Sequence, residues 1–289
     1  MMDMELYDPI KTAKTKYLFF TGKGGVGKTS IACVTAVALA DSGQKVLLVS
    51  TDPASNLQDV FGLELSDKGT EIKEAPGLVV ANLDPLAAAA EYRESVIGPY
   101  RGKLPESAIQ NMEEQLSGSC TVEIAAFNEF SNFLTDDKKA QDFDCIIFDT
   151  APTGHTLRML QLPSAWSGFI SESKHGASCL GQLSGLESKK AVYKKAANTL
   201  ADSSLTTLIL VTRPEKAPIL EAKRASDELG ALGIRKQLLV MNGILQGHDS
   251  MDKIEAALFE KQQAAVKSIP ESLLQYPITA MPLRAYNIT

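Results

Sequence analysis

The chain has 289 residues, of which 44% are hydrophobic and 22% are charged, a composition that can bury a substantial core and excludes disorder as the dominant state. Its 29 Lys and Arg against 35 Asp and Glu give a formal net charge of −6 at pH 7, which argues against a nucleic-acid partner bound through a broad basic surface. The sequence has no apolar run of the roughly 18–20 residues that a membrane helix needs. No apolar segment precedes Tyr17, so we do not expect its first residues to act as a secretory signal. We therefore expect a cytoplasmic protein.

Apolar, β-branched runs alternate with helical stretches along the chain, which predicts a mostly parallel sheet flanked by helices. The first run is followed by a glycine-rich turn and an expected helix over residues 28–42, which Gly43 ends. Each run finishes in polar or small residues, and open α/β sheets bind ligands at the carboxyl ends of their strands. The expected strands span residues 17–20, 45–50, 78–83, 144–149, 207–212 and 237–242.

Two long stretches without a strand signal, residues 85–142 and 156–201, lie on either side of the fourth expected strand. Their patterns are helical, and the first should hold helices over residues 87–97, 107–116 and 122–134. We expect the two insertions to pack together as a helical subdomain within a single domain of residues 1–289. The end of the sequence at Thr289 leaves open whether it is complete or the N-terminal half of a longer protein.

Residues 22–29, GKGGVGKT, match the phosphate-loop pattern GxxxxGK[ST] between a strand and a helix. In this pattern backbone N–H groups surround the β-phosphate, Lys28 reaches the β- and γ-phosphates, and Thr29 offers its hydroxyl to Mg²⁺. The loop also fits the GxGxxG pattern of dinucleotide-binding folds, but such folds need neither Lys28 nor Thr29, so we favour ATP. The expected nucleotide-binding residues are Gly22, Lys23, Gly24, Gly25, Val26, Gly27, Lys28, Thr29 and Ser30.

Two carboxylates at strand ends complete the expected site. Asp149 ends the apolar run CIIFD, the place of a Walker B acid that holds the water shell of Mg²⁺. Asp52 ends the second strand, where it would orient the attacking water beside the γ-phosphate. We expect Thr29, Asp52 and Asp149 to hold Mg²⁺, with a strand-end cap as the alternative role of either carboxylate.

The loop KGGVGKT resembles the deviant Walker A family of dimeric ATPases, because Lys23 stands near its start. In that family the first lysine crosses the dimer interface to the partner's nucleotide. A cation from the partner neutralises charge that develops on the transferred phosphoryl group. The resemblance therefore adds Lys23 to Asp52 and Lys28 as expected catalytic residues, against the alternative of a solvated surface lysine.

Five longer segments resemble one half of the ArsA family of arsenite- and antimonite-stimulated ATPases. These segments, with weaker similarity through Asn242 and the MPL at residues 281–283, are TGKGGVGKTS, LLVSTDPASN, EQLSGSCTVEIAAF, FDTAPTGHTLRMLQLP and HGASCLG. The resemblance implies a P-loop fold with a helical subdomain, hydrolysis of ATP to ADP and phosphate, and a pseudo-twofold dimer with ATP at its interface. It also places the adenine-binding segments at Asn242, Pro282 and Leu283.

In that family As(III) or Sb(III) is bound by cysteines at positions that are Cys120 and Cys179 here, and His155 matches a histidine associated with the same site. Both metalloids are soft centres that prefer thiolate ligands. Cys33 and Cys145 instead lie in apolar runs typical of core residues. The resemblance thus implies a metalloid that joins two halves of the assembly, as activator and as transported ligand.

The family also implies partners. Because ArsA proteins are usually described as two fused halves and this chain is one, we expect either a homodimer or a second fused half. An ArsB-like membrane efflux pump would hold the protein peripherally at the inner membrane, and an ArsD-like metallochaperone is a further expected partner.

Two alternatives belong to other functional classes. The sister family of targeting chaperones for tail-anchored membrane proteins uses ATP as a switch, and many of its members carry a CxxC zinc pair, which is absent from this sequence. Such chaperones need a wide apolar groove, whereas residues 104–134 are interrupted by polar side chains. A positioning ATPase would instead need a basic DNA-facing patch or an amphipathic membrane helix. We favour the metalloid-responsive ATPase.

Overall fold

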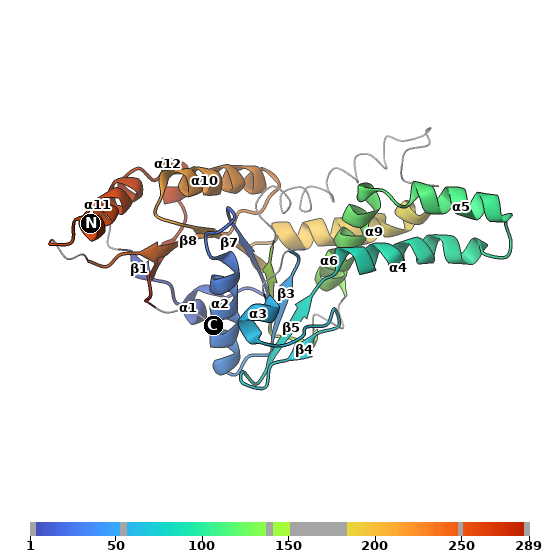
Figure 1. Cartoon of the computed structure of the whole chain (residues 1–289), viewed down its shortest axis with the longest axis horizontal. Helices are drawn as coiled ribbons and strands as arrows, with labels where there is room; N and C mark the ends of the chain where they lie inside the picture. Colours follow the sequence, from blue (N-terminus) through green and yellow to red (C-terminus); the bar gives the residue numbers. More distant parts are fainter. Residues whose placement is uncertain (1–3, 53–56, 137–140, 151–183, 248–250, 286–289) are drawn as a thin grey trace.

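In a computed structural model, residues 4–52, 57–136, 141–150, 184–247 and 251–285 are described (Figure 1). They contain a nine-stranded sheet in the order β1-β9-β8-β7-β2-β6-β3-β5-β4. Every neighbouring pair is parallel except β4 with β5, so the predicted mostly parallel α/β fold is confirmed. The strands are β1 (Glu5–Leu6), β2 (Tyr17–Thr21), β3 (Val46–Ser50), β4 (Thr70–Glu71), β5 (Leu78–Asn82), β6 (Cys145–Asp149), β7 (Thr206–Thr212), β8 (Gln237–Ile244) and β9 (Ile278–Pro282).

All six strands expected from the sequence are present as β2, β3, β5, β6, β7 and β8, but the expectation of six strands was incomplete. The additional strands β1, β4 and β9 lie toward the two edges of the sheet. Two of them have only two residues each, and β9 ends in a proline, so none carries a strong local strand pattern. Pairing with a neighbouring strand, rather than local sequence, makes these segments strands.

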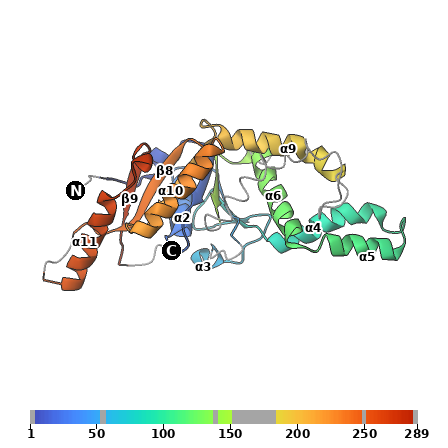
Figure 2. The same cartoon turned by 90° about the horizontal axis from the view of Figure 1, so that it is seen from above.

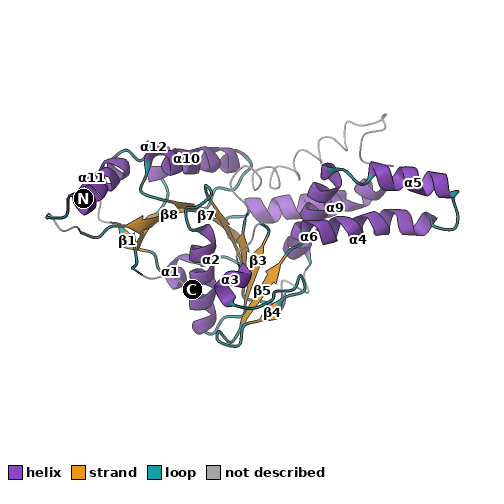
Figure 3. Ribbon diagram, in the orientation of Figure 1, coloured by secondary structure: helices purple, strands orange, loops and turns teal. Residues whose placement is uncertain are grey.

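Helices cover both faces of the sheet, as Figures 2 and 3 show. Alternate residues of the central strand divide between two cores: Leu18 and Phe20 pack with α2, whereas Tyr17 and Phe19 pack with helices on the opposite face. The helices of the first face are α1 (Pro9–Thr12), α2 (Lys28–Asp41) and α3 (Leu57–Phe61). Those on the opposite face include α6 (Ser119–Thr135), α9 (Ser184–Ala201), α10 (Lys216–Ala231), α11 (Lys253–Lys267) and α12 (Glu271–Leu274).

The helical subdomain joins both insertions. Figure 1 shows α4 (Pro85–Ile97) and α5 (Glu106–Gln115), with the short 3₁₀ helix η1 (Gly98–Tyr100) between them, extending away from the sheet beside α6 and α9. The Tyr193 hydroxyl of α9 donates a hydrogen bond to Asn128 Oδ1 of α6 at 2.7 Å. The Tyr193 ring also lies 5.0 Å, centroid to centroid, from that of Phe127. The described parts of the two insertions therefore pack against each other.

Aromatic rings fix α6 on the sheet. The ring of Phe130 meets Phe148 of β6 and Phe19 of β2 edge to face, with centroids 5.2 and 5.7 Å apart. Phe19 and Phe148 stack on each other at 4.6 Å, and all three rings are almost completely buried. Because Phe148 directly precedes Asp149, this aromatic cluster connects α6 to the carboxyl end of β6.

None of the helices in the described part of the chain combines the length and the apolar character that a bilayer-spanning helix requires.

Candidate nucleotide-binding site

The glycine-rich loop connects the central strand β2 to α2 and approaches neighbouring strands very closely. An added Cβ at Gly22 would lie 2.2 Å from the Val211 carbonyl oxygen of β7, a distance that no side chain can occupy. The Val26 side chain is buried in the core between α2 and the sheet. Gly27 has a left-handed backbone with φ of +90°, a conformation that glycine adopts without strain. Close packing against β7 therefore explains why the loop requires Gly22, and the left-handed backbone explains why it requires Gly27.

Helix α2 begins at Lys28 with Gly27 as its N-cap, and within the described residues no side chain caps this end. The amides of the first turn are thus left for a ligand, and the helix dipole favours an anion there. This arrangement suits the phosphate binding that the sequence predicts, which stays a prediction.

Lys28, Thr29, Asp52 and Asp149 lie close enough to interact. The Thr29 hydroxyl donates to Asp149 Oδ2 at 2.7 Å. Burial lowers the pKa of Lys28, and the negative charges of Asp149 and Asp52 partly oppose that shift. Burial raises the pKa of Asp149 to about 6, against the lowering effects of the Thr29 hydrogen bond and Lys28, while Asp52 adds a further rise. The structure therefore brings together four polar residues that the sequence selected from three separate segments.

The donor set fits a magnesium ion. Asp149 is 1% exposed, and its Oδ1 atom is buried without a hydrogen-bond partner among the described residues. An unpaired buried carboxylate oxygen is costly unless a cation or a donor satisfies it. Hydroxyl and carboxylate oxygens are the ligands that Mg²⁺ takes beside nucleotide phosphates, so Thr29 and Asp149 suit that ion.

The remaining expected residues lie around the carboxyl ends of the parallel strands. Lys23 is exposed on the loop. Asn242, in the last part of β8, donates its amide Nδ2 to the Val26 carbonyl of the loop at 2.9 Å. Pro282 ends β9 beside it and is buried, whereas Leu283 is 52% exposed. An adenine contact by these three residues stays a prediction.

Sequence analysis did not select Arg213, although it directly follows β7 at this edge. Its Nε lies 3.4 Å from Glu215 Oε1, and its guanidinium lies next to Gly243. The signal was available, because Arg213 follows a buried apolar strand just as Asp52 and Asp149 do.

Two of the four cysteines lie in the core, as their local sequences suggested. Cys33 and Cys145 are buried free thiols, and burial raises the pKa of each to about 12, so their interpretation as core residues is confirmed. Cys120 lies in the first turn of α6. Cys179 and His155 lie outside the described residues, so the metalloid site stays a prediction.

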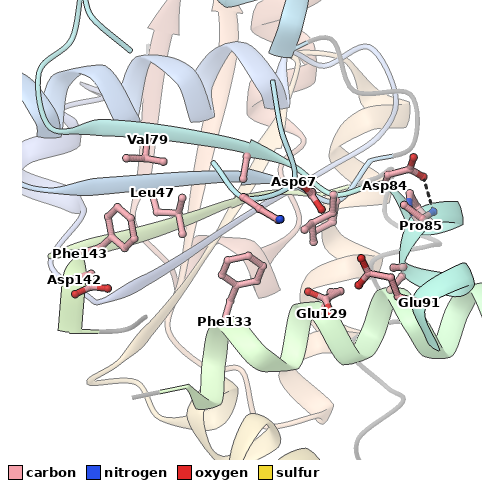
Figure 4. Close-up of a pocket in the computed structure, with 17 residues that line it drawn as sticks. Leu47, Asp67, Val79, Asp84, Pro85, Glu91, Glu129, Phe133, Asp142 and Phe143 are labelled. Atoms are coloured by element: carbon pink, nitrogen blue, oxygen red, sulfur yellow. Dashed lines mark hydrogen bonds between the residues drawn. The ribbon is translucent and has the colours of Figure 1, made fainter. Parts of the chain in front are cut away.

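A cavity of about 470 Å³ lies between β3, β5 and α6 (Figure 4). Leu47, Val79 and Phe133 contribute apolar walls, and Glu91 and Glu129 add carboxylates to its lining. None of the residues that line it belongs to the glycine-rich loop, so this cavity is separate from the phosphate site.

Comparison with known proteins identifies the family. A model of the anion-transporting ATPase family matches residues 15–289. The chain is 48% identical over 273 residues to an arsenical pump-driving ATPase of Escherichia coli, a match that covers 94% of this chain and 47% of the relative. It is 32% identical to a putative arsenical pump-driving ATPase 2 of Aquifex aeolicus, covering 94% of both chains. An ATPase GET3 of Debaryomyces hansenii is 30% identical over 99% of this chain and 91% of that protein.

The chain therefore belongs to the anion-transporting ATPase family. It spans about half the length of the Escherichia coli relative and nearly the whole length of the Aquifex aeolicus relative.

Proposed function

We propose that this member of the anion-transporting ATPase family hydrolyses ATP with Mg²⁺, and that arsenite or antimonite stimulates the reaction to drive metalloid efflux through a membrane pump. The observation that carries the proposal is the convergence of Lys28, Thr29, Asp52 and Asp149 at an uncapped helix N-terminus. The names of the arsenical pump-driving relatives support the metalloid as the effector.

In the proposed reaction the loop amides and Lys28 bind the phosphates, and Thr29 and Asp149 hold Mg²⁺, with Asp52 as a further candidate ligand. The bound metal neutralises phosphate charge. Asp52, at the neighbouring strand end, orients the water that attacks the γ-phosphate. Lys23, which is exposed, reaches the nucleotide of a second ATPase unit and stabilises the charge that develops in the transition state. We propose that Asn242, Pro282 and Leu283 border the adenine.

The proposed metalloid ligands are Cys120, Cys179 and His155. Cys120 lies in the first turn of α6, and further along this helix Phe130 packs against Phe148, the residue before Asp149. A metalloid that shifts α6 would therefore act on the carboxyl end of β6. Linkage requires that a metalloid which tightens nucleotide binding is itself bound more tightly with nucleotide, by a coupling of about 1–3 kcal/mol in ordinary cases.

We propose further that residues 1–289 act as one ATPase unit that pairs with a second copy or with a fused second half. The expected partners are an ArsB-like efflux pump in the inner membrane, at its cytoplasmic side, and an ArsD-like metallochaperone that delivers the metalloid. Two facing units would supply the third thiolate that a three-coordinate metalloid prefers.

The deciding experiment measures phosphate release with and without antimonite or arsenite for the wild type and for Cys120→Ser and Cys179→Ser. We expect stimulation in the wild type, and loss of stimulation with much of the basal rate retained in both variants. Equal stimulation in all three proteins would exclude these cysteines as ligands, and absence of hydrolysis in the wild type would exclude the ATPase.

The alternative, an ATP-switched chaperone for tail-anchored proteins, is represented by the GET3 relative. Such a chaperone needs an apolar surface for a membrane helix. Among the described residues, the cavity between β3, β5 and α6 is lined by the carboxylates Glu91 and Glu129, which suit an apolar helix poorly and favour the metalloid-driven function. Measuring the binding of a tail-anchor peptide with and without nucleotide separates the two, because only the chaperone should bind it with nucleotide-dependent affinity.

A further inference from the structure

Asn242 connects the far half of the sheet to the glycine-rich loop. Its Nδ2 atom donates to the Val26 carbonyl oxygen at 2.9 Å, between residues 216 positions apart. An added Cβ on Gly27 would lie only 2.2 Å from the same nitrogen. The amide and the loop backbone are thus in direct contact, without space for another group between them.

Strand β8 has a bulge next to this contact. Asn242 pairs with Met281 of β9 and Ile244 pairs with Pro282, so Gly243 is an extra residue on β8. Gly243 has φ of +80°, which glycine tolerates and most residues do not. Such a bulge changes the direction of neighbouring side chains, and bulges are common beside functional sites.

The hydrogen bond fixes the orientation of one peptide unit. The Val26 carbonyl and the Gly27 N–H belong to the same planar, trans peptide, so they point in opposite directions. Holding the carbonyl toward Asn242 directs the Gly27 N–H away from β8. The buried Val26 side chain holds the same residue from within the core, so the peptide has little freedom to rotate.

We propose that Asn242 is a positioning residue that keeps the Val26–Gly27 peptide in its phosphate-binding orientation before any nucleotide arrives. The proposal rests on the proposed function only in that the loop binds phosphate. It assigns to Asn242 a task that requires no base, which distinguishes it from a contact with adenine.

The first test needs no nucleotide. The loop exchange is read by hydrogen–deuterium exchange at the buried Ile31 amide, which donates to the Gly27 carbonyl of the loop at 3.0 Å. It should be about fivefold faster in Asn242→Ala than in the wild type, the effect expected for loss of one hydrogen bond. Asn242→Asp should exchange faster still, because a carboxylate would face the Val26 carbonyl. Asn82→Ala is the matched control, since Asn82 ends β5 at the same edge of the sheet, and its loop exchange should equal that of the wild type.

The second test distinguishes weaker binding of the phosphates by the loop from weaker binding of the adenine base. The dissociation constants of Mg-ATP and of Mg-tripolyphosphate, which has no base, should rise by a similar factor in Asn242→Ala. Unchanged loop exchange, or weaker ATP binding with tripolyphosphate binding intact, would overturn the proposal. If loop exchange is faster in Asn242→Ala than in the wild type but the wild type does not hydrolyse ATP, only the proposed function would be contradicted.

Discussion

The hydroxyl of Thr29 and the carboxylate of Asp149 are joined by a hydrogen bond of 2.7 Å between Oγ1 and Oδ2. One residue starts the helix after the glycine-rich loop and the other ends β6, 120 positions later. The bond leaves Oδ1 of Asp149 buried and unpaired within the described residues. A site arranged in this way is destabilising until a cation binds, and the prediction for Asp149→Asn depends on that property.

Asp149→Asn should stabilise the magnesium-free protein at neutral pH. Burial raises the pKa of Asp149 from 3.8 to about 6, so the folded state binds this proton more tightly than the unfolded state. The stability that Asp149 contributes is complete below its unfolded pKa and is lost as the pH rises through about 6. At pH 7.5 the variant should exceed the wild type by up to about 3 kcal/mol in free energy of unfolding, measured by urea denaturation.

The difference between the two proteins should shrink as the pH falls toward 4. Asp144→Asn is the control, because Asp144 precedes the opposite end of β6 and is exposed. Added Mg-ATP should stabilise the wild type more than Asp149→Asn. A difference in free energy of unfolding between wild type and Asp149→Asn that does not change with pH would contradict the raised pKa of Asp149.

Asp52→Asn should retain ATP binding and lose turnover. The side chain keeps its size but no longer orients the attacking water as a base, which typically reduces the rate by about 10²-fold or more. Nucleotide affinity and phosphate release should be measured on the same preparation, with Asp59→Asn of the adjacent α3 as an exposed control. Normal turnover in Asp52→Asn would show that another group positions the water.

Lys23→Ala should weaken ATP-dependent self-association. Lys23 is exposed on the loop, and its proposed contact exists only across the interface of two ATPase units. Light scattering or sedimentation with and without Mg-ATP measures the effect. Lys45→Ala is the matched control, because Lys45 is exposed and lies at the amino end of β3, away from the loop. An unchanged ATP-dependent dimer would count against the role of Lys23 in the partner's site.

Thiol labelling should leave Cys33 and Cys145 unmodified in the native protein. Both are buried, and their pKa values near 12 leave almost no thiolate at pH 7.5. Mass spectrometry after iodoacetamide treatment should find label on them only in denaturant, while antimonite should protect Cys120 and Cys179. Labelling of Cys33 or Cys145 in the native protein would contradict their burial. Labelling of Cys120 and Cys179 that antimonite does not reduce would contradict their role as metalloid ligands.

Much of the site was predictable because its parts are local patterns. Residues 22–29 fit the phosphate-loop pattern by composition and spacing alone, Asp149 ends the apolar strand β6, and Asp52 follows the apolar strand β3 by two residues. Parallel strands gather their carboxyl ends at one edge of a sheet, so the prediction that these residues meet needed no knowledge of the strand order.

The sequence alone therefore determined the α/β class and selected the residues of the proposed phosphate site, since both follow from periodicity and from residues adjacent in the chain. Only the tertiary structure decided that β6 lies between β2 and β3, that β9 exists beside β8, and that Asn242 holds the Val26 carbonyl. Strand neighbours and side-chain contacts between distant segments depend on how whole faces pack together, and no local pattern specifies its partner.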